Sequence, residues 1–267
     1  MSDNLQGKKI IITGATSGLG LAMAKAVAAA GASVLITGRS EEKIHNAVEE
    51  VKALNAEVYG LMMDVRNETE IENAVQWVTN KWGILDVLVN NAGIGMRTVN
   101  PSFLTKPEPF YKVTAEGFRN LIDTNLTGYF LVAKAFVPLF LQAGNGKIIN
   151  ISMNHETMRR KGFVPYGPSR AGAESLSLIM AEDLKEKNIA VNMLLPGGAT
   201  ETGMIPDEFR DEIIQHFQLL NPNVMAAPIV FLSSDESNGI TGQRIVAIDF
   251  EAWKSKLKEG KNEFFLK

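Results

Sequence analysis

Two kinds of hydrophobic pattern alternate along the chain. Short runs such as Val87-Leu88-Val89 are apolar at successive positions and have the length of β-strands. Between them lie longer segments with an apolar residue at about every third or fourth position, as in Ile44, Ala47 and Val51, which is typical of an amphipathic helix. The short runs predict seven strands, at residues 8–13, 33–37, 58–62, 86–90, 147–151, 190–195 and 244–248.

The alternation of strands and helices predicts an α/β fold, because a parallel crossover needs a helix between its two strands. Strands that are apolar at successive positions are buried on both sides, so we expect helices on both faces of the sheet. The expected fold class is a doubly wound, Rossmann-type parallel sheet of seven strands. No Gly/Ser-rich or Pro-rich linker divides the sequence, so we expect a single domain over residues 1–267, with its core at about 8–249.

Composition and charge narrow the range of functions. The 267 residues carry a formal net charge of -3, which predicts no nucleic-acid partner. The sequence has no cysteine, and this excludes disulfides, thiolate catalysis and cysteine-ligated metals. His45, His155 and His216 lie far apart, so we expect chemistry without a metal. The short polar N-terminus, and an apolar stretch at 129–141 too short to span a bilayer, predict a cytoplasmic protein without a membrane partner.

A glycine-rich loop follows the first predicted strand. Gly14, Gly18 and Gly20 have a GxxxGxG spacing and precede an alanine-rich helical stretch at 21–30. Glycines allow a sharp turn and a close approach to a pyrophosphate, whose charge is met by free N–H groups at the helix N-terminus. This context favours a dinucleotide site over an ordinary tight turn. We expect the other loop residues to line the cofactor as well: Thr16, Ser17 and Leu19.

The end of the second predicted strand bears on the choice of cofactor. An acidic side chain there would accept a hydrogen bond from the ribose 2′-hydroxyl of NAD(H), whereas an arginine can pair with the 2′-phosphate of NADP(H). The sequence has Arg39 and Ser40 at this place. It therefore favours NADP(H), and a solvated arginine ahead of a helix capped by Ser40 is the open alternative.

From about Lys8 to Asp249, the sequence resembles the short-chain dehydrogenase/reductase family. Six motifs in order carry the resemblance: the loop at 13–20, Asp64-Val65 after the third strand, Asn90 to Gly93 after the fourth, Asn125, Ser152, and Tyr166 with a basic residue four positions later. The resemblance implies that Asp64 and Val65 lie near the adenine. It also implies that Asn91, Ala92 and Gly93 line the cofactor and stabilise the central sheet. On its own, Asp64 is equally compatible with a turn or a helix cap.

Asn125 is the first of four expected catalytic residues. It follows one predicted helical face together with Phe118, Leu121 and Tyr129, where a buried amide needs hydrogen-bonding partners. In the family the matching asparagine belongs to the catalytic tetrad and holds a water molecule in a proton relay. A purely structural asparagine is the alternative.

Ser152 and Tyr166 are expected to act on the substrate. Ser152 follows a strand and precedes Tyr166 by fourteen residues, a spacing that resembles the family's. Its hydroxyl would hydrogen-bond the substrate carbonyl oxygen, and Tyr166 would donate the proton. A phenol has a reference pKa of about 10, so proton transfer at neutral pH needs a positive charge nearby. The residue at position 170 lies one helical turn after Tyr166, on the same face.

Position 170 departs from the family. The family has a lysine there, which also holds the nicotinamide ribose, whereas this sequence has Arg170. An arginine keeps the positive charge and can donate to ribose oxygens, but it is effectively never deprotonated and cannot pass on a proton. Two functions therefore stay open: a working reductase in which Arg170 supports Tyr166 and the ribose, or a regulatory or scaffold protein that binds the dinucleotide without turnover.

Two loops are expected at the carboxyl edge of the sheet, where open α/β sheets bind their ligands. One resembles the family's Pro-Gly segment, so Gly197 and Thr202 are expected to contact the cofactor, with Thr200 as the alternative threonine and a plain loop role also open. The other is the proline-containing segment at 100–114, which we expect to help select the substrate.

The expected function is reversible hydride transfer between NADP(H), in preference to NAD(H), and a carbonyl or secondary alcohol. The resemblance suggests a sugar, a sugar acid, a 3-oxoacyl compound or a similar small substrate, and it does not separate them. Dehydration or epimerisation is a further possibility within the family. Because the family is usually dimeric or tetrameric through the helices that carry Asn125 and Tyr166, we also expect a homo-oligomer.

Overall fold

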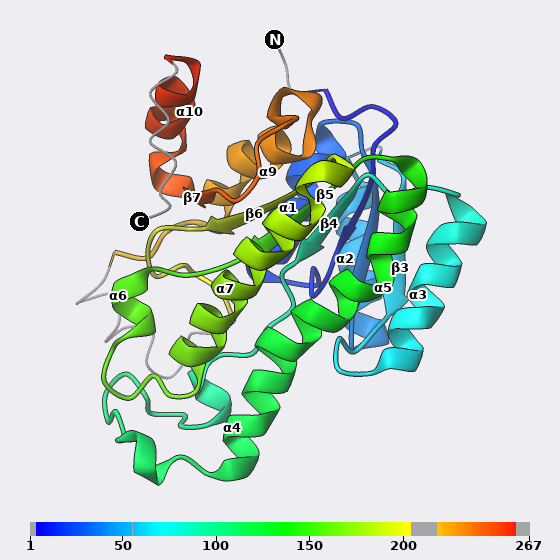
Figure 1. Cartoon of the computed structure of the whole chain (residues 1–267). Helices are drawn as coiled ribbons and strands as arrows, with labels where there is room; N and C mark the ends of the chain where they lie inside the picture. The colour runs from blue at the N-terminus through cyan, green and yellow to red at the C-terminus, as the bar shows by residue number, and fades with distance from the viewer. Residues whose placement is uncertain (1–3, 55, 204–217, 260–267) are drawn as a thin grey trace.

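The computed structural model describes residues 4–54, 56–203 and 218–259 and contains a sheet of seven parallel strands (Figure 1). The strand order is β3-β2-β1-β4-β5-β6-β7, so the chain winds outward from β1 on one side and from β4 on the other. The predicted doubly wound α/β fold is confirmed. The strands are β1 (Lys9–Ile12), β2 (Ser33–Gly38), β3 (Val58–Met62), β4 (Val87–Asn90), β5 (Gly146–Ile151), β6 (Ile189–Leu195) and β7 (Arg244–Val246).

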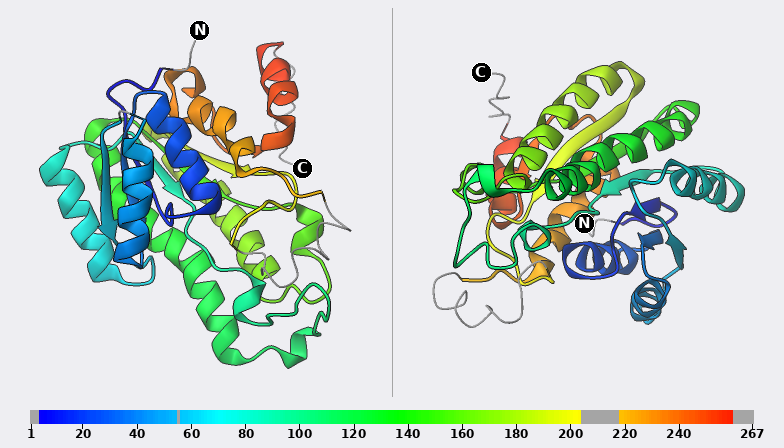
Figure 2. Two further views of the ribbon diagram at one scale, coloured as in Figure 1. Left: turned by 180° about the vertical axis from the view of Figure 1, so that it is seen from behind. Right: turned by 90° about the horizontal axis from the view of Figure 1, so that it is seen from below.

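Helices cover both faces of the sheet, as the two views of Figure 2 show. In β1, Ile10 and Ile12 pack into the core on one face and Ile11 packs into the core on the other, since successive strand residues point to opposite sides. This double burial explains why the strands are apolar at successive positions. The first face carries α1 (Gly18–Ala29), α2 (Glu41–Lys52) and α9 (Ala226–Ser233), and the second carries α3 (Glu68–Lys81), α5 (Gly128–Ala143) and α7 (Tyr166–Leu184).

The last strand is shorter than predicted. It ends at Val246 rather than at residue 248, because Ala247–Asp249 forms a 3-10 turn that leads into α10 (Phe250–Lys258). Phe250 and Trp253 of this helix pack on Phe231 of α9, with ring centroids 5.5 and 6.0 Å away. The aromatic residues after the last strand therefore anchor a C-terminal helix on the first face.

Asn125 lies in a π-helical turn that the hydrophobic pattern did not predict. This turn, η3 (Asp123–Thr127), joins α4 (Ala115–Ile122) to α5. It widens the helix and breaks the single predicted face: Phe118 is 41 % exposed, whereas Asn125 is fully buried. Such turns are frequent at functional sites, where the extra residue changes the direction of a side chain.

One helical stretch of the described residues, Ala115–Ala143, is long and apolar enough to cross a membrane by length and composition alone. Core helices of soluble proteins meet the same criterion. Here α5 packs on β4, β5 and α3, so its apolar residues have a place in the layered fold. The stretch is therefore weak support for a membrane span.

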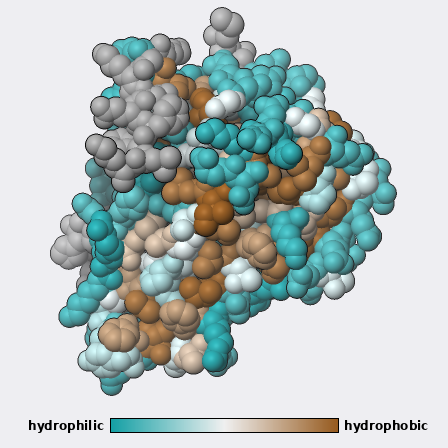
Figure 3. All heavy atoms as spheres, in the orientation of Figure 1, coloured by the Kyte–Doolittle hydropathy of each residue, from teal (hydrophilic) through white to brown (hydrophobic). Residues whose placement is uncertain are grey.

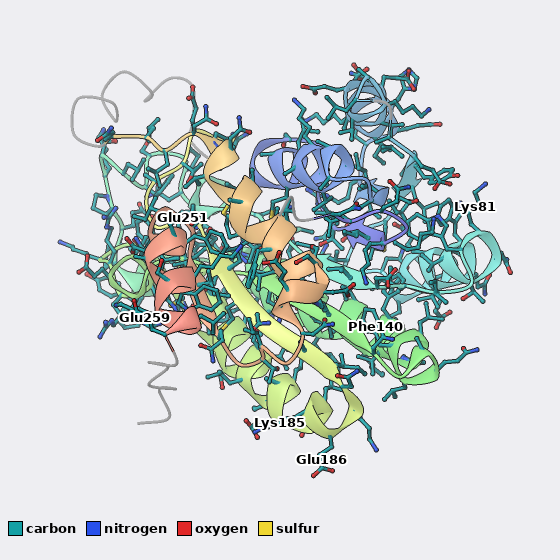
Figure 4. All side chains as sticks on the ribbon, turned by 90° about the horizontal axis from the view of Figure 1, so that it is seen from above. Lys81, Phe140, Lys185, Glu186, Glu251 and Glu259 are labelled. Atoms are coloured by element: carbon teal, nitrogen blue, oxygen red, sulfur yellow. The ribbon has the colours of Figure 1, made fainter. Side chains whose placement is uncertain are left out.

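The carboxyl ends of the strands face the lower part of Figure 1, where α4 and the short α6 (His155–Met158) lie. Figure 4 views the molecule from the opposite end. There Lys81, Phe140 and Lys185 mark the C-terminal ends of α3, α5 and α7, as expected for helices that run antiparallel to the strands. Most residues predicted to bind cofactor or substrate lie at the carboxyl ends of the strands or in the loops that follow them, whereas Asn125, Tyr166 and Arg170 lie in helical segments.

Candidate active site

The glycine loop turns between β1 and α1 and packs against the segment after β4. Gly18 has a φ of +55°, which favours glycine. A Cβ atom on Gly20 would lie 2.5 Å from Nδ2 of Asn91 and 2.7 Å from the carbonyl oxygen of Gly14, so a larger residue does not fit. Asn91 Nδ2 donates to the carbonyl oxygens of Thr13 and Gly14, at 2.9 and 3.1 Å. Asn91 thus holds the shape of the loop.

The N-terminus of α1 has the features of an anion site. Ser17 occupies the N-cap position with no side-chain capping bond, and the first turn contains no acidic residue. The first N–H groups of a helix have no intrahelical partner and carry partial positive charge. A cavity of about 360 Å³ adjoins this end and is lined by Gly18, Lys25 and Thr202, among others. These residues fit the pyrophosphate of a dinucleotide.

The loop after β6 reaches the glycine loop through Thr202. A Cβ atom on Gly18 would lie 3.1 Å from Cγ2 of Thr202, so the two are in contact. Thr200, the alternative threonine, is 8 % exposed and pairs with Leu220 in an isolated bridge. The carbonyl oxygen of Gly197 accepts from Asn154 at 2.9 Å. Of the two threonines, Thr202 is therefore the one beside the predicted cofactor loop.

Charged residues gather where β2 and β3 end. Arg39 is exposed, and its Nη1 lies 4.0 Å from Oδ2 of Asp64. Asp64 is held more closely by Arg66, whose hydrogen bond lowers the pKa of the carboxyl below its usual range. Ser40 caps α2, as predicted, by accepting from the N–H of Lys43 at 3.4 Å. Arg39 therefore has its guanidinium largely in solvent at the end of β2.

The other cofactor candidates have mainly packing contacts. Val65 is 4 % exposed, and its Cγ2 lies 2.7 Å from where a Cβ on Gly128 would be. The side chain of Thr16 lies against Gly38. Leu19 packs at the margin of the core on the first face. The N–H of Ala92 donates to Oγ1 of Thr13 at 3.0 Å, which joins the loops after β1 and β4.

Asn125 binds the backbone of the loop after β4. Its Oδ1 accepts from the N–H of Ile94 at 2.8 Å, and its Nδ2 donates to the carbonyl oxygen of Ile94 at 2.9 Å. A third contact runs from Nδ2 to Oγ of Ser169 at 3.4 Å. These bonds fix the segment around Gly93, so the structural role left open by the sequence is present in the geometry.

Arg170 is buried in the middle of the site, with 3 % of its surface exposed. Its Nη1 donates to the hydroxyl of Tyr129 at 2.7 Å and to the carbonyl oxygen of Ile151 at 2.8 Å. Its guanidinium carbon lies 5.4 Å from the centre of the Tyr166 ring. The guanidinium also makes a side-chain hydrogen bond with Tyr166. Burial alone would lower the pKa of Arg170, but the two phenols raise it above its usual value, so the charge persists.

Two further features describe the surroundings of the Arg170 guanidinium. Its Nε is buried and has no hydrogen-bond partner among the described residues, and a buried donor of this kind is costly unless a ligand atom accepts from it. On the other side, a Cβ on Gly93 would lie 2.6 Å from Nη2, so only glycine leaves room for the guanidinium. The contact of Arg170 with the nicotinamide ribose, which the family resemblance implies, stays a prediction.

Ser152 directly follows β5 and is hydrogen-bonded to a carboxylate. Its Oγ donates to Oε1 of Glu174 at 2.5 Å. Glu174 also accepts from Nε of Arg244 at 2.9 Å and pairs through its other oxygen with Nε2 of His155 at 2.9 Å. To donate to a substrate carbonyl, the Ser152 hydroxyl has to turn away from Glu174.

Tyr166 begins α7, so Pro168 falls in the first turn of the helix, where proline is tolerated. Its ring packs against a small apolar cluster of Met96, Phe103 and Phe163. This cluster joins the long loop after β4 to the segment before α7. Met96, Phe103 and Phe163 are 3, 9 and 6 % exposed, so the Tyr166 ring packs on buried apolar side chains on this side.

Three residues of the site were not among the predicted site residues: Tyr129, Glu174 and Arg244. Two of them had a signal in the spacing. Tyr129 follows Asn125 by four positions, and Glu174 follows Arg170 by four, so each lies on the helical face of a predicted site residue. Arg244 belongs to β7 and had no such signal, because only the fold brings it to Glu174.

Comparison with known proteins identifies the family of the chain. The family described as short chain dehydrogenase matches residues 8–213. The 3-oxoacyl-(acyl-carrier-protein) reductase FabG of Thermotoga maritima is 34 % identical over 251 residues, which cover 92 % of this chain and 97 % of the relative. The 2-dehydro-3-deoxy-D-gluconate 5-dehydrogenase of Formosa agariphila is 31 % identical over 255 residues, which cover 92 % of each chain.

Solved structures support the same relationship. A variant of actinorhodin polyketide ketoreductase with NADPH has a TM-score of 0.79 and 26 % sequence identity, and the match covers 92 % of this chain and 96 % of the other. The similarity therefore extends over the whole sheet and both helical layers.

Proposed function

Because the chain belongs to the short-chain dehydrogenase/reductase family, whose members are NAD(P)-dependent oxidoreductases, we propose that it interconverts a carbonyl compound and a secondary alcohol with NADP(H) as the preferred cofactor. The observation that carries the proposal is that the predicted catalytic residues surround Arg170. This one buried cation bonds to Tyr166 and to the carbonyl oxygen of Ile151, next to Ser152. The alternative of a dinucleotide-binding protein without turnover has no support from the relatives, which are named as enzymes.

In this proposal three side chains act on the reacting oxygen or support those that do. Ser152 turns its hydroxyl from Glu174 to the substrate oxygen and stabilises the charge that develops there. Tyr166 exchanges the proton with the same oxygen. Arg170 stabilises the negative form of the phenol with a charge that is never lost. A bound nicotinamide supplies or accepts the hydride.

Arg170 cannot carry a proton away from Tyr166, so the route of the proton to solvent has to avoid it. Asn125, whose amide is bound to the backbone of Ile94, keeps the loop after β4 in place. We assign Asn125 this positioning role and propose that water molecules carry the proton from Tyr166 to solvent.

The preference for NADP(H) is supported by Arg39, which is 57 % exposed at the end of β2 with no acidic residue at that strand end. A 2′-phosphate at this place would face the guanidinium. The structural relative that contains NADPH is consistent with the same choice.

The named relatives bear on the choice of substrate class. A 3-oxoacyl compound, the substrate class in the name of the FabG relative, places an aliphatic chain beside its ketone. We rank 3-oxoacyl compounds above sugar acids, the class named for the Formosa agariphila relative, because the FabG relative is matched at 34 % identity and the Formosa agariphila relative at 31 %.

A homo-oligomer is supported by apolar surface on the second face. Figure 3 shows a hydrophobic band across the side of the molecule formed by α5 and α7. Phe130 of α5 and Ile179 of α7 are 44 % and 57 % exposed, respectively. We propose that a second copy of the chain covers this band, and light scattering would give the number of subunits. A cytoplasmic location stays a prediction.

The experiment is a substrate screen with the purified protein. NADPH or NADH is mixed with 3-oxoacyl thioesters, sugar acids and simple ketones, and oxidation is followed by nicotinamide absorbance. We expect turnover with NADPH and a 3-oxoacyl thioester, and loss of about a hundredfold or more in the Tyr166→Phe variant. The enzyme proposal fails if both cofactors bind and no carbonyl or alcohol is converted.

A further inference from the structure

The arginine at position 170 has a partner that would be superfluous for a lysine. Tyr129 is fully buried, with 1 % of its surface exposed, and its hydroxyl points at Nη1 of Arg170. The same hydroxyl lies 3.2 Å from the carbonyl oxygen of Ile151 and donates to it. Arg170 Nη1, the Tyr129 hydroxyl and the Ile151 carbonyl therefore form a closed triangle of hydrogen bonds.

The charges of the groups around Arg170 show which of them hold the guanidinium. The ionisable groups that act on the guanidinium are two phenols, Tyr129 of α5 and Tyr166 of α7. On another side, the position of a Cβ on Gly93 would lie 2.6 Å from Nη2 of Arg170 and 3.1 Å from Oδ1 of Asn125, and both of these neighbours are neutral. Burial raises the pKa of Tyr129, although Arg170 partly opposes this, so Tyr129 stays protonated and serves as a neutral acceptor.

Side-chain length distinguishes the two possible cations. A lysine nitrogen reaches about the position of the arginine Cζ, one bond short of Nη1. From there it would not make the 2.7 Å contact with the Tyr129 hydroxyl. A lysine would also not need the Tyr129 hydroxyl, since the three donors of a compact ammonium can find acceptors nearer the backbone. The buried guanidinium, in contrast, needs an acceptor at the far end.

We propose that Tyr129 is a positioning residue for Arg170: its hydroxyl, together with the Ile151 carbonyl, clamps the far end of the guanidinium and so holds the cation in place behind Tyr166 and against the cofactor ribose. The chain thus carries an arginine–tyrosine pair where the family has a lysine. This inference rests on the proposed function only in assigning Arg170 to the cofactor and to Tyr166.

The test is a cycle of four proteins: the parent, Tyr129→Phe, Arg170→Lys, and both substitutions together. NADPH dissociation constants are measured by fluorescence, which needs no substrate. We expect Tyr129→Phe to weaken NADPH binding about tenfold when position 170 is arginine and less than about twofold when it is lysine. The matched control, Tyr59→Phe, removes a hydroxyl that donates to Glu57 near the start of β3, at the opposite edge of the sheet from the site, and should leave the affinity unchanged.

A merely structural role for Tyr129 gives a different result. If the hydroxyl only supports the packing of α5, its loss has the same effect with either cation, and equal factors in the two backgrounds overturn the proposal. Turnover extends the test once a substrate is known: kcat should fall in Tyr129→Phe, and the double variant should be no worse than Arg170→Lys.

A measurement on the parent protein keeps the inference testable if Tyr129→Phe does not fold. With nitrogen-labelled arginine, the Nη1 protons of a clamped guanidinium should give separate signals in slow exchange, identified by their absence in Arg170→Lys. A single, rapidly averaged signal for Arg170 would overturn the clamp. This result does not depend on cofactor binding or turnover, so a failure of the proposed function would be seen separately.

Discussion

Replacing Arg39 with alanine is the most direct test of the cofactor assignment. The side chain is 57 % exposed, and its ion-pairing distance to Asp64 is 4.0 Å. Arg66 holds the same carboxylate more closely, with its Nε 2.9 Å from Oδ1. Arg39→Ala therefore leaves Asp64 with its principal partner, and the fold should be unaffected.

The magnitude follows from the contact that would be lost. A hydrogen bond to a charged group contributes about 1.5–3 kcal/mol, which is about 10- to 150-fold in a dissociation constant. Solvent screening at an exposed guanidinium favours the lower end of this range. We expect about tenfold weaker NADPH binding in Arg39→Ala and a change of less than about twofold for NADH, which has no 2′-phosphate.

The assay is a fluorescence titration of both cofactors against the parent and the variant, repeated at raised salt. The difference between NADPH and NADH should shrink as salt screens the phosphate contact. Arg119→Ala, which removes an equal charge from the exposed side of α4, is the matched control. Equal affinity of the parent for the two cofactors, or an equal loss for both in Arg39→Ala, would refute the reasoning.

Three further predictions concern the loop, the carboxylate network and a buried lysine. Gly20→Ala places a Cβ 2.5 Å from Nδ2 of Asn91 and should lower stability by about 1–3 kcal/mol and NADPH affinity by at least about tenfold. Urea unfolding and fluorescence titration measure the two effects, and an unchanged affinity would contradict the prediction. Glu174→Ala leaves Ser152 and Arg244 without their shared acceptor and should lower the free energy of unfolding by about 2–3 kcal/mol. Substitution of the exposed His155 should lower the free energy of unfolding far less, and equal losses in the two variants would refute the network. Burial lowers the pKa of Lys147 from 10.5 to about 8. Between pH 8 and 10.5 the Lys147 side chain is therefore protonated in the unfolded chain but not in the folded chain, so its contribution makes the free energy of unfolding rise with pH by up to about 3 kcal/mol. Urea unfolding of Lys147→Met across this pH range should lack that rise, and a parallel pH dependence of the two proteins would disprove the assignment.

The fold was predictable because its determinants are local and repeated. Successive apolar residues in the strands reflect burial on both faces, and every predicted strand occurs with its boundaries moved by two residues at most. Glycine positions were equally informative, since Gly18 and Gly20 meet backbone and side-chain limits that only glycine satisfies. In both cases a property of one residue type corresponds to one structural requirement.

The rest of the site depended on distances that the sequence does not contain. The π-turn at Asp123–Thr127 shifted the helical face on which Phe118 had been placed. The Glu174 network joins β5, α6, α7 and β7, and only the strand order brings these elements together. A motif identifies the reacting groups, but it does not identify the acceptors and cations that orient them.

Arg170 shows how this limit affects a functional interpretation. Taken alone, an arginine in place of a lysine suggests impaired catalysis, because it adds bulk and cannot release a proton. The structure adds that the guanidinium has two acceptors at its far end, and that one of them, the Tyr129 hydroxyl, comes from a different helix. If this pair acts as one unit, Arg170→Lys removes a satisfied contact instead of restoring a missing function. The lysine variant should then bind NADPH no better than the parent, and a gain in affinity or turnover would show that the arginine is an impairment.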